Sequence, residues 1–368
     1  MSGKYENSLG IIAMDNCKDF ALKIDKKLMK KRKTNESFLI PVSVPRFNNG
    51  ESKAVINDTV RDKDLYIISD IGNHSETYKM YDYVNHKSPD DHFQDIKRVL
   101  SAVRGQAERI TVVMPLLYES RQHRRKGRES LDCALSLQEL QHLGVQNIVT
   151  FDVHDPNIQN AVPTSMSFEN FYPTNTILKQ FIKNEDFNPE DIVFISPDTG
   201  AFDRTRFYAN MFQADVGIFH KRRDLSKIVD GKNPIVAHEY LGRDLKGKTA
   251  IIIDDMIASG GSILDVAYNI KKRGAKKVYL IATFSMFTNG VKVFEDAYKE
   301  ELFDSLYSTN LTYIDPKILK EKWYKQVDCS TYASEIIDTL NSSGSISKII
   351  NGKEKILKML EDKKKGNL

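Results

Sequence analysis

Two adjacent carboxylates are followed by a turn of small and hydroxyl-bearing residues between positions 254 and 262. Asp254 and Asp255 come directly after the β-branched run Ile251–Ile253, and the segment Ser259–Ser262 reads Ser-Gly-Gly-Ser. The run predicts a strand, the glycines let backbone amides approach an anion, and a helix predicted to follow offers the N–H groups of its first turn. The carboxylates remain available for hydroxyl groups or a cation. The segment therefore predicts a sugar-phosphate site.

A basic run follows another predicted strand. Five of the eight residues in Arg121–Arg128 are Arg or Lys, and the run comes shortly after the strand predicted at Ile110–Met114. Ligands of α/β proteins bind at the carboxyl ends of strands, and guanidinium groups suit phosphate oxygens. A polyphosphate site and a solvent-exposed basic loop are both consistent with these residues.

Three further strand ends carry residues that suit phosphate chemistry. His154 follows the strand predicted to end at Phe151, and Asp198 follows the apolar run that begins at Ile192. With phosphate oxygens, these groups suit Mg²⁺, although a lone histidine is more often structural. Lys221 and Arg223 alternate on one side of an extended segment after Phe219, which indicates either a reaction centre or an ordinary surface loop.

The elements that must position these residues alternate between strand-like and helix-like segments, which predicts mostly parallel sheets flanked by helices. A weak internal repeat of strand, helix, glycine and strand suggests two similar α/β domains, although chance similarity also explains one such match. The repeat covers residues 110–151 and 249–283. The predicted domains are residues 1–165 and 166–368.

Composition limits the classes of function. The formal net charge of +4 over 368 residues does not favour nucleic acid as the main ligand. The three cysteines are far apart, and the longest mostly apolar run, Val278–Phe287, is too short to cross a membrane. The N-terminus lacks the pattern of a signal peptide. These features predict a cytoplasmic protein that binds neither nucleic acid nor membrane.

Phosphate binding has no standard motif here, because the chain contains neither G-x-x-x-x-G-K-[ST] nor G-x-G-x-x-G. The chain instead resembles the ribose-phosphate pyrophosphokinase family from about Phe38 to Ile350. The resemblance is carried, in order, by Arg46–Glu51, Ser120–Gln122, Asp152–His154, Ser196–Gly200, His220–Arg223 and Asp254–Ser262. It implies two phosphoribosyltransferase-like domains, with ATP bound by the first and ribose 5-phosphate by the second.

The resemblance also implies a role for each matching residue. The ribose 5-phosphate site would comprise Asp254, Asp255, Ser259, Gly260, Gly261 and Ser262. ATP would be held by Phe47, Asn49, Glu51, Arg121, Gln122 and Arg124, the first three of them reaching the adenine of a neighbouring subunit. His154 and Asp198 would organise Mg²⁺, and Lys221 and Arg223 would stabilise the transition state.

The implied activity is transfer of the pyrophosphoryl group of ATP to the anomeric hydroxyl of ribose 5-phosphate, for nucleotide biosynthesis. The implied assembly is a homo-oligomer based on dimers, with a hexamer as one form. Three positions depart from the family pattern, which has Asp where this chain has Ala258, His123 and Asn49. Ala258 leaves a non-catalytic regulatory subunit as an alternative. A base-specific phosphoribosyltransferase would share the Asp-Asp loop but would not account for two domains.

Overall fold

The computed structural model describes residues 8–223 and 235–367, with the side chains of 221–223, 235–238 and 348 outside the description. The chain forms two compact units. The first contains the described residues up to Pro173 together with Asn310–Asp315 and Asp328–Asn351, and the second contains Thr174–Thr309, Pro316–Val327 and the residues from Gly352 onward. The predicted boundary after residue 165 assigns Asn310–Asp315 and Asp328–Asn351 to the second domain, whereas the structure places both segments in the first unit.

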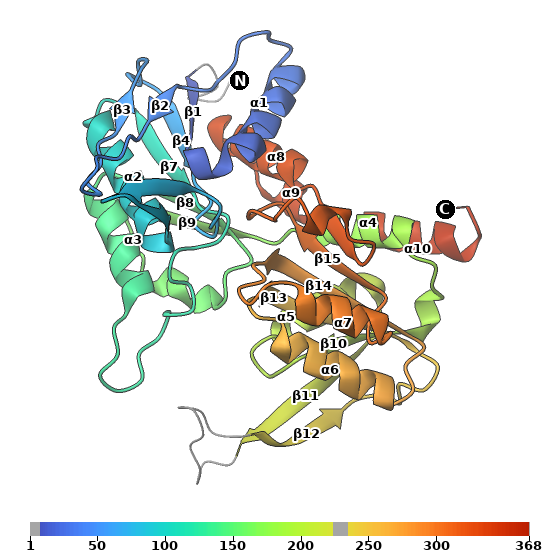
Figure 1. Cartoon of the computed structure of the whole chain (residues 1–368). Coiled ribbons are helices and arrows are strands. Elements are labelled where there is room, and N and C mark those ends of the chain that lie inside the picture. The colour runs from blue at the N-terminus through green and yellow to red at the C-terminus, as the bar shows by residue number, and fades with distance from the viewer. Residues whose placement is uncertain (1–7, 224–234, 368) are drawn as a thin grey trace. The chain divides into compact units, whose positions relative to one another are not determined.

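The first unit is built on a five-stranded parallel sheet in the order β1-β4-β7-β8-β9 (Figure 1). Its strands are β1 (Leu9–Ala13), β4 (Asp64–Ile68), β7 (Arg109–Val113), β8 (Asn147–Phe151) and β9 (Ser167–Phe171). Its helices are α1 (Lys18–Arg32), α2 (Pro89–Val103), α3 (Asp132–His142), α8 (Ser330–Asn341) and α9 (Ser347–Ile350), with 3-10 turns η1 (Asp15–Cys17) and η2 (Pro156–Ala161). Two small hairpins add β2 (Val42–Ser43), β3 (Val55–Ile56), β5 (Thr77–Met80) and β6 (Tyr83–His86).

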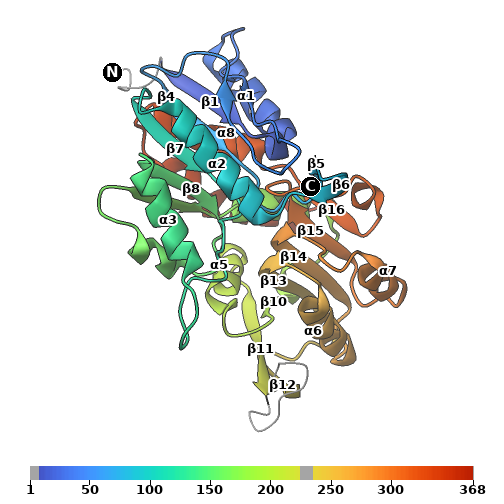
Figure 2. The ribbon, with the colours of Figure 1, turned by 60° about the vertical axis from the view of Figure 1, so that its left-hand side comes forward.

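Helices cover both faces of this sheet because the chain changes direction after β1. Leu39 forms a parallel bridge to Ile11 on the free edge of β1, so the connection through α1 runs away from β4. The connections through α2 and α3 run in the opposite direction, from β4 to β7 and from β7 to β8. Right-handed crossovers then place α1 on one face, where it packs against α8, and α2 and α3 on the other (Figures 1 and 2). Burial on both faces explains why strands such as β4 are apolar runs rather than alternating patterns.

The second unit holds a seven-stranded sheet in the order β12-β11-β10-β13-β14-β15-β16, parallel except for β12. Its strands are β10 (Ile192–Ser196), β11 (Asp215–Arg223), β12 (Ile235–Leu241), β13 (Thr249–Ile257), β14 (Lys277–Ser285), β15 (Ser305–Thr309) and β16 (Tyr324–Val327). Its helices are α4 (Thr174–Asn184), α5 (Phe202–Phe212), α6 (Gly261–Lys272), α7 (Lys292–Lys299) and α10 (Lys353–Lys364), with η3 (Pro189–Asp191) and η4 (Ile318–Lys320). Figure 2 shows α5 on one side of the sheet and α6 and α7 on the other.

The predicted fold class, two α/β domains with mostly parallel sheets flanked by helices, is confirmed, but two strands are longer than predicted. β13 was expected to end at Ile253 and continues to Ile257, because β14 runs beside it as far as the pair Ile257↔Ser285. β11 was expected to end at Phe219 and continues to Arg223, where it forms an antiparallel hairpin with β12.

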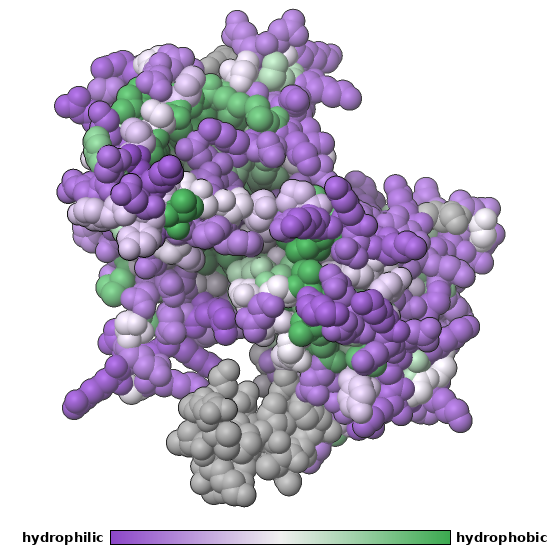
Figure 3. Space-filling view, in the orientation of Figure 1, coloured by the Kyte–Doolittle hydropathy of each residue, from purple (hydrophilic) through white to green (hydrophobic). Residues whose placement is uncertain are grey.

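Hydrophilic side chains cover most of the molecular face in Figure 3, in keeping with a sequence in which 28% of residues are charged. Within residues 8–223 and 235–367, no helix is long and apolar enough to cross a membrane.

Candidate functional site

The acidic pair lies inside β13 rather than after it. Because successive side chains of a strand point to opposite faces, Asp254 and Asp255 leave the sheet on different sides. β10 pairs with β13 only as far as Ile195↔Ile252, so Asp254 stands just past the last paired residue on that side. Asp255 is buried, Asp254 is half-buried, and the Asp254 Oδ1 accepts the Asp255 amide at 2.9 Å. One carboxylate is therefore held within the fold, and the other lies at an open strand edge.

Negative charge is concentrated around Asp254. Burial raises the pKa of the Asp254 carboxyl well above its usual range, and the neighbouring carboxylates of Asp255 and Asp198 raise it further. The guanidinium of Arg204, in the first turn of α5, acts in the opposite direction. A cation or a hydroxyl donor beside Asp254 would relieve this repulsion. The sequence prediction did not include Arg204. The only sign of it in the sequence was its position shortly after Asp198, which itself follows the strand β10.

The turn after β13 depends on a glycine that has no room for a side chain. Gly260 has a φ of +89°, and a Cβ at this position would lie 2.2 Å from the Cζ of Phe294. The neighbouring Gly261 is different, since a Cβ there would meet no atom within 4 Å. Gly260 is thus required by the fold, whereas Gly261 borders open space.

That open space lies at the N-terminus of α6. Gly261 is the first residue of α6, and the Leu264 amide donates to the Gly260 carbonyl at 3.1 Å. Amides of a first helical turn have no acceptor within their own helix, and the helix dipole favours an anion there. Ser262 is exposed in the same turn and Ser259 is half-buried just before it. The arrangement fits a phosphate group.

Asp198 lies at the end of the neighbouring strand β10. Its carboxylate Oδ1 accepts the amides of Gly200 at 2.8 Å and Ala201 at 3.0 Å, and the Ser196 hydroxyl donates to its carbonyl at 2.6 Å. These bonds fix the Asp198 side chain at the start of α5 although the residue is exposed. Its charge acts on Asp254. The carboxylates of Asp198 and Asp254 therefore both lie at the carboxyl ends of strands of the second sheet.

The predicted adenine-binding residues form a tight turn in the first unit. The Phe47 amide donates to the Glu51 carbonyl at 2.7 Å, and the Asn49 Nδ2 donates to the Glu51 Oε2 at 2.8 Å. Arg46 supports the turn by donating to the Gly50 carbonyl at 3.2 Å. The Phe47 side chain is 48% exposed, so its ring is available for stacking.

The predicted phosphate-binding residues of ATP follow β7. Arg121, Gln122 and Arg124 are all exposed, and the Gln122 amide donates to the Glu119 carbonyl at 2.8 Å. His154 is also exposed and follows β8, the strand next to β7. The chain turns sharply just before it, where Asp152 has a φ of 42°. The first unit therefore gathers these residues at the carboxyl end of its sheet.

The predicted residues divide between the two units. The first unit holds Phe47, Asn49, Glu51, Arg121, Gln122, Arg124 and His154, and the second holds Asp198, Asp254, Asp255, Ser259, Gly260, Gly261 and Ser262. The backbones of Lys221 and Arg223 pair with His238 and Ile235 of β12, while their side chains lie outside the described part. Among the described residues, no group of three or more His, Cys, Asp or Glu side chains forms a metal cluster.

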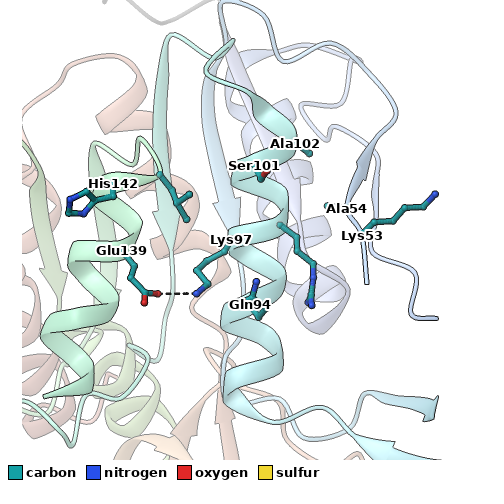
Figure 4. A pocket seen from close by; sticks show the side chains of 10 residues that line it. Lys53, Ala54, Gln94, Lys97, Ser101, Ala102, Glu139 and His142 are labelled. Atoms are coloured by element: carbon teal, nitrogen blue, oxygen red, sulfur yellow. Dashed lines mark hydrogen bonds and ion pairs between the residues drawn. The ribbon is translucent and has the colours of Figure 1, made fainter. Parts of the chain in front are cut away.

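A separate groove of about 870 Å³ lies in the first unit between α2, α3 and the segment around Lys53 (Figure 4). Lys97 and Glu139 form an ion pair at 3.0 Å across it. None of the predicted site residues lines the groove.

Comparison with known proteins agrees with the fold. The model of the N-terminal domain of ribose phosphate pyrophosphokinase matches residues 9–144, and the phosphoribosyl transferase domain model matches residues 174–316. A ribose-phosphate pyrophosphokinase of Mycoplasmopsis pulmonis is 30% identical over 82% of this chain and 86% of the relative. One from Clostridium acetobutylicum is 32% identical over 67% of this chain and 70% of the relative.

Among solved structures, phosphoribosylpyrophosphate synthetase from Mycobacterium smegmatis superposes with a TM-score of 0.74 at 20% identity, covering 92% of this chain and all of that one. The fold and the acidic strand before the glycine turn define a protein of the phosphoribosyltransferase fold class. Within that class, the chain belongs to the ribose-phosphate pyrophosphokinase family.

Proposed function

We propose that this protein is a ribose-phosphate diphosphokinase, which transfers the pyrophosphoryl group of ATP to ribose 5-phosphate and supplies nucleotide biosynthesis. Family membership supports the activity. The observation that carries the proposal is that one strand-turn-helix segment holds both the half-buried Asp254 near the end of β13 and the open helix N-terminus at Gly261. A sugar phosphate offers hydroxyl groups for the first and an anion for the second.

The ribose 5-phosphate half of the site rests on the second unit. Asp254 accepts hydrogen bonds from the ribose hydroxyls, and these bonds stabilise the ionised form of a carboxyl whose pKa is raised by burial and by neighbouring carboxylates. Asp255, which the resemblance assigns to the same hydroxyls, is buried and leaves the sheet on the other side. The turn Ser259–Ser262 holds the 5-phosphate through backbone amides and serine hydroxyls. Ala258 lacks the carboxylate expected from the family pattern, so this chain makes fewer polar contacts to the sugar.

The ATP half rests on the first unit. Phe47 stacks on the adenine, Asn49 and Glu51 provide its hydrogen-bonding groups, and Arg121, Gln122 and Arg124 hold the phosphates. The resemblance assigns the Phe47 turn to a neighbouring subunit's adenine, so we propose a dimer-based homo-oligomer. Sedimentation with and without ATP tests this assembly, and a monomer under both conditions would contradict it.

The reaction needs alignment and charge stabilisation rather than a covalent nucleophile. The anomeric oxygen of ribose 5-phosphate forms a bond to the β-phosphorus of ATP, the bond from that phosphorus to the oxygen bridging it to the α-phosphorus breaks, and AMP leaves with the electron pair. The hydroxyl proton passes to solvent. Lys221 and Arg223 place positive charge on the phosphoryl oxygens, where negative charge increases in the transition state.

The exposed carboxylate of Asp198, held in place by backbone amides, suits Mg²⁺ that also binds phosphate oxygens. Bound there, Mg²⁺ would neutralise phosphate charge. Asp254 remains for the sugar. We therefore propose Mg²⁺ as the cofactor, with Asp198 as a protein ligand and His154 in the ligand role that the resemblance assigns to it.

The non-catalytic alternative draws on one position, Ala258. The names of the relatives favour the enzyme, and a regulatory subunit would not require His154, Asp198, Lys221 and Arg223 together. The cysteines Cys17, Cys133 and Cys329 are free and buried, which supports the proposed cytoplasmic location.

The test is an incubation of the purified chain with ATP, ribose 5-phosphate and Mg²⁺, with AMP and phosphoribosyl pyrophosphate measured by chromatography. We expect both products, and neither when ribose 5-phosphate or Mg²⁺ is omitted. Absence of both products from the complete mixture would reject the enzyme and favour the regulatory subunit.

A further inference from the structure

Two loops of the first unit meet at the carboxyl ends of β7 and β8. These strands are paired neighbours, with Val113 opposite Val149. The loop after β7 carries the basic run that begins at Arg121, and the loop after β8 carries His154 and Asp155. Adjacent parallel strands bring such loops together, but they do not by themselves fix a long exposed loop in one position.

His123 provides a direct contact between the two loops. Its Nε2 lies 3.1 Å from the Asp155 Oδ2, and its Nδ1 lies 3.2 Å from the Ser120 carbonyl oxygen. Only 10% of the His123 side chain is exposed, in contrast to the exposed residues on either side of it. An imidazolium donates to both oxygens and a neutral ring donates to one, so a hydrogen bond remains in either form.

The Asp155 end of the contact is fixed to the fold. The Asp155 Oδ1 accepts the Asn157 amide at 2.9 Å and so caps η2, whose first residue is Pro156. The second oxygen of the same carboxylate faces His123. Asp155 thus uses one oxygen for its own loop and the other for the neighbouring loop.

The contact also lies beside the residues assigned to ATP. Gln122 directly precedes His123, and the His123 ring centroid lies 5.5 Å from that of His154. If the His123 contact were lost, the loop would keep the local bond between the Gln122 amide and the Glu119 carbonyl, but would lose its bond to Asp155. The orientation of Arg121 and Gln122 relative to His154 would then be less fixed.

We propose that the His123–Asp155 contact is a tether that positions Arg121 and Gln122 for the phosphates of ATP. His123 is a positioning residue, since it acts through its neighbours. This inference rests on the proposed function for the identity of the ligand, whereas the tether itself does not. The Asp expected at position 123 from the family pattern would place two carboxylates together, so the tether is specific to chains that carry this pair.

Kinetics of His123→Ala and His123→Asp test the positioning role. We expect the KM for ATP to rise about tenfold, the scale of losing one hydrogen bond to a charged group, with kcat and the KM for ribose 5-phosphate nearly unchanged. His142→Ala is the matched control, because the exposed His142 bonds only to the Gln138 carbonyl within α3 among the contacts described. The control should retain the wild-type KM.

A rescue separates the tether from general damage to the loop. In His123→Gln, the side-chain amide extends about as far as the imidazole Nε2 and donates to the Asp155 carboxylate, which still accepts the Asn157 amide. We expect this variant to recover most of the ATP affinity that His123→Asp loses. A His123→Gln variant no better than His123→Asp would count against a direct contact.

Trypsin cleavage of the ligand-free protein tests the tether without any activity. The loop offers cleavage sites at Arg121 and Arg124, and cleavage there, followed by mass spectrometry, should be several-fold faster in His123→Ala than in the wild type or His142→Ala. Unchanged cleavage together with an unchanged KM for ATP would overturn the inference. If the wild type makes no product while cleavage accelerates as expected, the proposed function fails and the tether stands.

Discussion

Alanine substitutions at the neighbouring Gly260 and Gly261 should affect different properties: the first should lower stability, and the second should weaken binding of ribose 5-phosphate. At Gly260, the left-handed backbone costs a non-glycine residue about 1–2 kcal/mol, and the contact of the new methyl with Phe294 adds about 1–3 kcal/mol of overpacking. The φ of +89° and the 2.2 Å approach to the Phe294 ring are the causes. We therefore expect Gly260→Ala to lower the free energy of unfolding by about 2–5 kcal/mol.

Gly261→Ala is the matched control for stability and the probe of binding. No atom lies within 4 Å of its Cβ, so the free energy of unfolding should stay within about 1 kcal/mol of wild type, the range of helix propensity. The methyl nevertheless enters the space proposed for the 5-phosphate. The KM for ribose 5-phosphate should rise while that for ATP is unchanged.

The chain carries its own probe for this measurement. Trp323 is the single tryptophan, is buried, and stacks on Phe294 with ring centroids 5.8 Å apart. Urea unfolding followed by tryptophan fluorescence therefore reports on the surroundings of Phe294, whose ring the new methyl of Gly260→Ala would displace. A Gly260→Ala protein as stable as wild type would refute the packing argument, and normal ribose 5-phosphate kinetics in Gly261→Ala would refute the phosphate site.

Three further outcomes are expected. Burial raises the pKa of Asp70 to about 7, so the folded state retains a proton that the unfolded state loses. The free energy of unfolding should therefore fall by about 1.4 kcal/mol per pH unit between about pH 4 and 7, and the fall should be smaller in Asp70→Asn. Equal slopes in urea unfolding of the two proteins would contradict this. Ala258→Asp should lower the KM for ribose 5-phosphate in steady-state kinetics; no change would mean that other groups already hold the sugar. Lys221→Ala should lower kcat by about 10² or more, and a near-normal kcat would remove its proposed role.

The sheets were predictable because their strands are apolar runs bounded by glycine and polar residues. The length of β13 was not, because the pairing that extends it past Asp254 comes from β14, whose register is not visible in the sequence. The β11–β12 hairpin was missed for a similar reason, since the antiparallel pairing that extends β11 to Arg223 comes from β12 and is not visible in the sequence.

The candidate site residues were predicted from local motifs, whereas the residues that support them come from elsewhere in the chain. Phe294 fills the space beside Gly260 although 34 residues separate them in sequence, and Asp155 faces His123 from a different loop. Such contacts are set by tertiary packing, which residue spacing does not record. The return of Asn310–Asp315 to the first unit is fixed in the same way, by bonds from Thr312 and Tyr313 to the buried Asp70.

Phosphorus NMR of the complete reaction tests the proposed pyrophosphoryl transfer most directly. With ATP, ribose 5-phosphate and Mg²⁺, we expect the three ATP resonances to be replaced by those of AMP and of the diphosphate of phosphoribosyl pyrophosphate, in equal amounts. Formation of ADP, which would indicate transfer of a single phosphoryl group, or no change in the spectrum would contradict the proposed activity.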